Sequence, residues 1–185
     1  MHKTKILLLT AGYTLAFAYA GCKKADVPEA DGSPAVEATV QAGTPSGYAR
    51  KETYFKLPEH KGGEVDLSAY AGKPVMLMFF TEACPYCRKA APFIERMHKE
   101  FAPKGLTTIG ICLEDASSAA AGFARDFRLT FPVAYKGHDT ARRYRAQGVP
   151  FIYLLSKDHS IRNFWAGYDE QFDAPIRKGI EELLK

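Results

Sequence analysis

A continuous apolar run followed by a CxxC motif constrains the fold of this chain more than any other stretch. Residues 75–80 read VMLMFF, and a run of that length without a polar face is typical of a strand covered on both sides. Cys84 and Cys87 follow with CxxC spacing, and the apolar residues of 94–101 then recur with the spacing of an amphipathic helix. The sequence therefore predicts two thiols at the start of a helix, directly behind a buried strand.

This order gives the two cysteines different chemical roles. Pro85 occupies the expected first helical position, where its missing N–H has no partner to lose and its φ is already helical. Cys84 then lies at the N-cap, where the unpaired N–H groups and the helix dipole favour a thiolate over a thiol. Cys87 lies one turn further in. We expect Cys84 to attack a disulfide and Cys87 to resolve the resulting mixed disulfide.

Two other interpretations of the CxxC motif are weaker. Half of a zinc site needs two further ligands at short spacing, and none follows the motif. An inert structural disulfide does not explain why the motif lies directly after a buried strand. We therefore expect no metal ion at Cys84 and Cys87, and no cofactor.

The segment resembles the active site of the thioredoxin superfamily, and its flanks resemble the membrane-anchored TlpA/ResA branch. The matching residues are Gly72-Lys73-Pro74, Cys84-Pro85-Tyr86-Cys87, Pro92 and Gly148-Val149-Pro150, within a resemblance that spans about residues 54–185. It implies an α/β, three-layer thioredoxin-like fold with a mixed central sheet flanked by helices, preceded by an N-terminal β-hairpin extension.

The resemblance also implies roles for residues around the dithiol. Pro150 would be a cis-proline that faces the cysteines and keeps a metal from bridging them, whereas without the resemblance it is a proline tolerated at the start of a strand. The Val149 backbone would pair with an extended substrate, with Pro85 and Tyr86 as neighbouring contacts. Tyr86 is alternatively just an exposed aromatic residue.

The proton-handling acids of the relatives are missing. The acid that ResA-type proteins carry three residues after the second cysteine is Ala90 here, and the buried acid of thioredoxin corresponds to Met78. Glu82, the acid nearest to the motif, is a candidate proton relay for Cys87, with a solvated loop carboxylate as the alternative. Cys112 is interpreted as a core residue, with a third redox cysteine as the alternative.

The N-terminal part of the sequence predicts export and tethering. Residues 1–21 have a basic start, a short apolar stretch and small residues before Cys22, which resembles a lipoprotein signal peptide with Cys22 as the lipidated residue. Tyr19 departs from the usual aliphatic residue of that pattern, and an ordinary cleaved signal is the alternative. Residues 22–48 read as a flexible linker, and residues 49–185 as the thioredoxin-like domain.

Within the domain, periodicity and turn residues predict the remaining elements. They are a hairpin over 54–67, a strand over 106–113, a helix over 116–127, a short extended piece over 131–135, a helix over 138–147, paired strands over 151–155 and 161–165, and a helix over 169–184 interrupted near Pro175.

The combined expectation is an exported, membrane-tethered thiol–disulfide oxidoreductase. The chain carries 25 Lys and Arg against 21 Asp and Glu, and two of the lysines lie in the predicted signal, so the remaining charge is too small and dispersed to indicate nucleic acid. The resemblance implies that a membrane electron donor supplies the protein and that client proteins with disulfides are reduced, plausibly apocytochromes c. A thiol peroxidase, for which Thr81 and Arg88 are a poor match, and a non-catalytic binding module remain alternatives.

Overall fold

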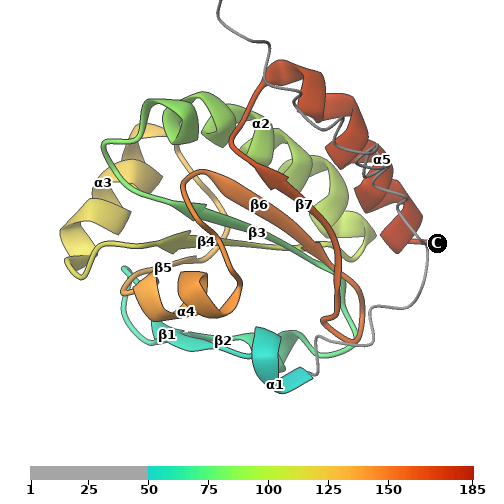
Figure 1. Cartoon of the computed structure of the whole chain (residues 1–185), viewed down its shortest axis with the longest axis horizontal. Helices are drawn as coiled ribbons and strands as arrows, with labels where there is room; N and C mark the ends of the chain where they lie inside the picture. The colour runs from blue at the N-terminus through green and yellow to red at the C-terminus, as the bar shows by residue number, and fades with distance from the viewer. Residues whose placement is uncertain (1–49) are drawn as a thin grey trace, which may run out of the picture. The chain divides into compact units, whose positions relative to one another are not determined.

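The apolar run forms the central strand of a five-stranded sheet in the computed structural model, which describes residues 50–185 (Figure 1). β3 (Val75–Phe80) pairs with β4 (Thr107–Cys112) in parallel and with β6 (Phe151–Leu155) in antiparallel orientation. β5 (Val133–Ala134) extends the sheet beside β4, and β7 (Ile161–Ala166) beside β6, which gives the order β5-β4-β3-β6-β7. Every residue of β3 is buried, as expected for a strand covered on both faces.

Three helices cover one face of this sheet. They are α2 (Pro85–Phe101), α3 (Ser117–Asp126) and α5 (Asp173–Leu183), drawn above the sheet in Figure 1. Met76, Met78 and Phe80 point from β3 into the same core as the inner faces of these helices. The Phe80 ring stacks on Phe123 of α3 at a centroid distance of 4.2 Å.

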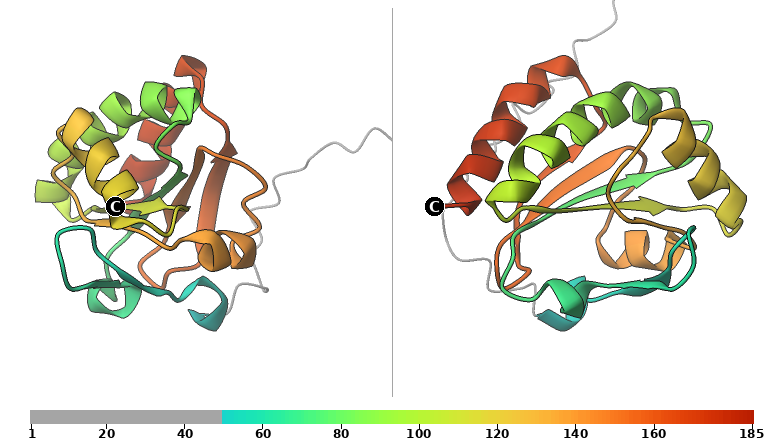
Figure 2. Two further views of the ribbon diagram at one scale, coloured as in Figure 1. Left: turned by 90° about the vertical axis from the view of Figure 1, so that its left-hand side faces the viewer. Right: turned by 180° about the vertical axis from the view of Figure 1, so that it is seen from behind.

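The other face is covered by a hairpin and one short helix. The hairpin consists of β1 (Lys56–Pro58) and β2 (Glu64–Asp66), flanked by α1 (Arg50–Thr53) and a 3₁₀ turn over Leu67–Tyr70, and the short helix is α4 (His138–Arg143). Both views in Figure 2 place these elements opposite α2. The core between them and the sheet contains Phe79, Tyr144 and Tyr153, whose rings are in mutual contact at 5.3 to 5.8 Å.

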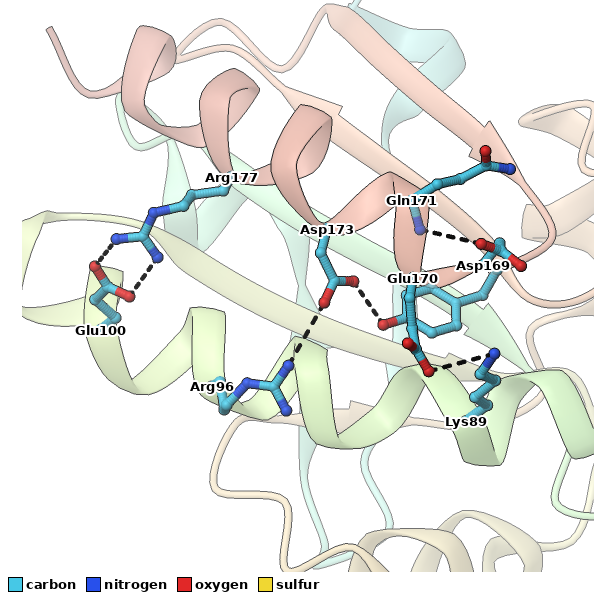
Figure 3. Close-up of polar contacts among 9 residues, drawn as sticks. Lys89, Arg96, Glu100, Asp169, Glu170, Gln171, Asp173 and Arg177 are labelled. Carbon is cyan, nitrogen blue, oxygen red and sulfur yellow. Dashed lines mark hydrogen bonds and ion pairs between the residues drawn. The ribbon is translucent and has the colours of Figure 1, made fainter.

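Polar contacts align α5 with α2 along the outside of the molecule. The ion pairs are Lys89–Glu170, Arg96–Asp173 and Arg177–Glu100, and the Tyr168 hydroxyl donates to Asp173 (Figure 3). The side chains of the three ion pairs are 31–76% exposed, whereas Tyr168 is buried, and ion pairs at such exposure contribute about 0–1 kcal/mol each. The apolar contacts of Ile176 and Ile180, both fully buried, therefore dominate the packing of α5.

The thioredoxin-like fold, the mixed sheet and the N-terminal hairpin are confirmed. Several element boundaries shift by one or two residues, and two helices differ from prediction by four residues at one end. The helix predicted over 138–147 ends at Arg143, because Arg145 takes a left-handed φ of 58° and the Tyr144 carbonyl accepts a hydrogen bond from Tyr153 instead. The last helix begins at Asp173 after a 3₁₀ turn over Glu170–Phe172, with Pro175 in its first turn, where a missing N–H costs little.

The predicted signal over 1–21, Cys22 and the linker over 22–48 lie outside the described residues. Within residues 50–185, none of the helices combines the length and the apolar composition that crossing a membrane requires.

Candidate active site

The first cysteine caps helix α2, as its position before Pro85 predicts. Cys84 has extended backbone angles, φ −67° and ψ 115°, and Pro85 is the first helical residue. The backbone N–H of Cys87 donates to the Cys84 Sγ at 3.2 Å. A sulfur in this position lies among N–H groups that have no intrahelical acceptor, and these groups stabilise negative charge on it. This geometry favours negative charge on Cys84 rather than on Cys87.

The second cysteine lies in an apolar environment. Cys87 is fully buried, whereas Cys84 is partly exposed, and both are free thiols. Met78 and Ala90, at the positions where the resemblance to thioredoxin and ResA implied acids, are also fully buried and belong to the same core cluster. Burial, followed by its interaction with Cys84, raises the pKa of Cys87 well above its ordinary value. Cys87 therefore remains protonated at neutral pH.

The loop before β6 brings a backbone acceptor to the nucleophile. The Val149–Pro150 peptide bond is cis, as the resemblance implied. The Cys84 thiol lies 3.6 Å from the Val149 carbonyl oxygen, and the Pro150 carbonyl is occupied by the Gly167 N–H at 2.8 Å. The structure thus joins Cys84 and Val149, which lie 65 residues apart in the sequence.

A cavity of about 540 Å³ adjoins this loop. It is lined by Gly148, Val149, Phe151, Phe164 and Gly167 among others, and Phe164 is 61% exposed. Tyr86, in the first turn of α2, is 63% exposed. An extended peptide next to Val149 would thus meet apolar surface close to the dithiol.

Glu82 lies on the side of the loop that faces α3. Its backbone N–H donates to the carboxylate of Glu114, and its own carboxylate lies against Gly122, where an added Cβ would collide with Oε1. Cys112, at the end of β4, is fully buried and its thiol donates to Glu114 Oε2 at 2.8 Å. The structure therefore places Glu82 in a cluster with Cys112 and Glu114.

Glu114 is a site residue that the sequence interpretation missed. It follows β4 by two residues, and β4 is the parallel neighbour of the strand that carries the CxxC motif. Because parallel neighbours end at the same edge of a sheet, this position was the available signal for a side chain next to the dithiol loop.

Arg88 points away from the sulfurs. Its guanidinium pairs with Asp126 of α3 at 3.1 Å and lies over the ring of Phe127 at 4.9 Å. Within the described part of the chain, no group of three or more His, Cys, Asp or Glu side chains has an arrangement that could hold a metal ion.

Comparison with known proteins agrees with this geometry. The family model described as AhpC/TSA family matches residues 49–164. The protein named thiol-disulfide oxidoreductase ResA from Bacillus thuringiensis subsp. konkukian is 27% identical over 132 residues, covering 71% of this chain and 73% of that protein. ResA from Geobacillus kaustophilus is 26% identical over 130 residues, covering 70% and 74%.

Solved structures show the same relationship. A protein from Chlorobium tepidum named thiol:disulfide interchange protein DsbE superposes with a TM-score of 0.67 at 26% identity, covering 71% of this chain and 94% of that one. A Bacteroides thetaiotaomicron structure named as a protein disulfide isomerase gives 0.64 at 29% identity, covering 71% and 86%. Because the family model spans more than half of the sequence, this chain belongs to the AhpC/TSA family of thioredoxin-fold proteins.

Proposed function

We propose that this protein is a thiol–disulfide oxidoreductase that reduces or exchanges disulfides in client proteins through Cys84 and Cys87. The observation that carries the proposal is the placement of a partly exposed thiol at the N-cap of α2, beside the Val149 carbonyl and one turn before a buried second thiol. The names of the ResA and DsbE relatives support the same chemistry.

The reaction follows from the different surroundings of the two sulfurs. The Cys84 thiolate attacks one sulfur of a client disulfide, so that a Cys84–client bond forms, the client disulfide breaks and one client thiolate leaves. Cys87 then loses its proton and attacks Cys84, which forms the Cys84–Cys87 disulfide and releases the second client thiolate. The client gains two electrons, and the protein must be reduced again by a dithiol donor.

An extended client segment fits beside the nucleophile. The Val149 backbone would pair with the segment by β-addition, while Pro150 faces the sulfurs and Pro85 and Tyr86 flank the other side. The cavity next to Val149 would receive apolar side chains of the segment.

The proton that Cys87 loses would pass to Glu82 or to water. A Glu82→Gln variant distinguishes the two acceptors, because release slows only if the Glu82 carboxylate accepts the proton. The rate of client release from a preformed mixed disulfide is the measurement.

The cellular setting is also part of the proposal. We place the domain outside the cytoplasm, held at a membrane by a lipid on Cys22 and by the linker over 22–48, and supplied with electrons by a membrane thiol–disulfide donor. Oxidised apocytochromes c are the proposed clients, as the resemblance to the TlpA/ResA branch implies. Mass spectrometry of the N-terminal peptide, together with membrane fractionation of wild type and Cys22→Ser, tests the anchor.

An insulin-reduction assay tests the activity. Wild type should reduce insulin and Cys84→Ser should not, and equal activity in both would end the catalytic proposal. Cys87→Ser should accumulate clients as mixed disulfides on Cys84, which mass spectrometry identifies. Peroxide consumption by the same samples would instead indicate a thiol peroxidase, an outcome that the engagement of Arg88 by Asp126 disfavours.

A further inference from the structure

A carboxylate from the neighbouring strand holds the loop that carries the nucleophile. Residues 81–83 connect β3 to α2, and both oxygens of Glu114 accept the backbone N–H of Glu82 at 3.2 Å. The N–H of Cys84 donates to the Thr81 carbonyl at 3.3 Å. The loop is therefore closed on itself and also fixed to the end of β4.

Glu114 is itself held in place through both its carboxylate and its backbone. The Cys112 thiol donates to Oε2 at 2.8 Å, and burial, followed by the bond to Glu114, raises the pKa of Cys112, so the thiol remains a donor at neutral pH. The Glu114 backbone is also fixed, because its carbonyl accepts the N–H of Lys136 at 2.9 Å and the preceding Leu113 N–H donates to the Phe80 carbonyl at 2.9 Å.

We propose that Glu114 is a positioning residue for Cys84. By fixing the loop, it keeps the Cys84 Sγ over the Cys87 N–H, the contact that stabilises the attacking thiolate, and the Val149 carbonyl marks the position of the protonated thiol. The inference rests on the proposed function, because it concerns the reactivity of the same sulfur. Cys112 has a supporting part in it, as the donor that orients the carboxylate.

Positioning and charge predict opposite results when Glu114 is neutralised. If Glu114 acted as a negative charge near the dithiol, its removal would favour the Cys84 thiolate and speed its reactions. If Glu114 positions the loop, its removal lets Cys84 leave the N-cap and slows them. A hydrogen bond to a charged group is worth at least about tenfold in an equilibrium constant, so loss of the contact between the Cys87 N–H and Cys84 should slow alkylation about tenfold.

The experiment compares Cys84 alkylation by iodoacetamide in the full-length protein, followed by mass spectrometry of the peptide that contains Cys84. Glu114→Ala should react about tenfold more slowly than wild type, and Glu114→Gln, which keeps one acceptor oxygen, should fall between them. Asp115→Asn is the matched control, because Asp115 is an exposed acid on the same loop, and it should keep the wild-type rate.

The equilibrium constant with glutathione gives an independent measurement. Losing the N-cap contact disfavours the reduced form, so Glu114→Ala should shift this constant about tenfold towards the disulfide, or about 30 mV. Cys112→Ala should shift both quantities in the same direction by less, and it serves with Glu114→Gln if Glu114→Ala fails to fold.

Wild-type or faster alkylation in the folded Glu114 variants would overturn the inference. An equal loss in Asp115→Asn would overturn it as well, because the effect would then not depend on the hydrogen bond between the Glu82 N–H and Glu114. If the wild-type protein fails to reduce insulin, the proposed function is wrong. The alkylation rates of Cys84 test the role of Glu114 independently of that result.

Discussion

The release of a client should accelerate steeply with pH, because the resolving thiol is buried. The pKa of Cys87 lies above the ordinary value of 9.0, with burial as the largest cause. At pH 7, less than about 1% of Cys87 is therefore thiolate. Burial, the largest cause of the raised pKa, persists in the mixed disulfide. Between pH 6 and pH 8, the thiolate fraction of Cys87 should rise about tenfold per unit, and the release rate should rise with it.

Stopped-flow measurement of a single release step tests this expectation. The mixed disulfide between Cys84 and a chromophoric thiol is formed first, and the release of the thiol is then followed at pH 6, 7 and 8. Cys87→Ser provides the control, since its residual release reports only attack by other nucleophiles. A release rate that stays constant from pH 6 to pH 8 in wild type would refute the reasoning, because release would then not follow the thiolate fraction of Cys87.

Three further predictions concern stability and use urea unfolding. Gly137→Ala should cost about 1–3 kcal/mol, because its Cβ would collide with Ile111 and lie 2.8 Å from a backbone oxygen. Tyr144→Phe should cost about 1–3 kcal/mol by removing the buried 2.6 Å bond to the Thr53 carbonyl, and an unchanged midpoint would contradict this. Burial lowers the pKa of His98, so the unfolded chain binds its proton more readily, and stability should fall as pH drops below about 6.5; His98→Gln should reduce that fall.

The sequence predicts those parts of the fold that depend on local patterns. The buried strand, the capped helix behind it and the hairpin strands each follow from runs and spacings of fewer than 20 residues. The early end of α4 does not, because it depends on Tyr153 donating to the Tyr144 carbonyl from the neighbouring strand. Local propensity does not predict such a tertiary contact.

The burial of Glu95 shows the same limit of prediction from local sequence patterns. Glu95 belongs to a helix whose apolar face is clear in the sequence, yet its side chain is only 6% exposed. It is satisfied by the N–H and hydroxyl of Thr130, at 3.0 and 2.7 Å, which lie 35 residues away. A carboxylate is tolerated in such a place because these donors replace water. The pairing depends on how the loop before β5 packs on α2, which no spacing in the sequence reveals.

In the candidate site, local sequence explains the environment of Cys84, whereas tertiary packing determines that of Cys87. This difference has a chemical consequence. The activation of Cys84 is local, since Pro85 and the start of α2 suffice to place its sulfur among unpaired N–H groups. The surroundings of Cys87 depend on tertiary packing, and they contain the apolar side chains of Met78 and Ala90. In the proposed reaction, release by the buried Cys87 is therefore expected to be slower than attack by Cys84. The mixed disulfide should therefore be the species that accumulates during turnover, and more of it should be trapped by acid quenching at pH 6 than at pH 8.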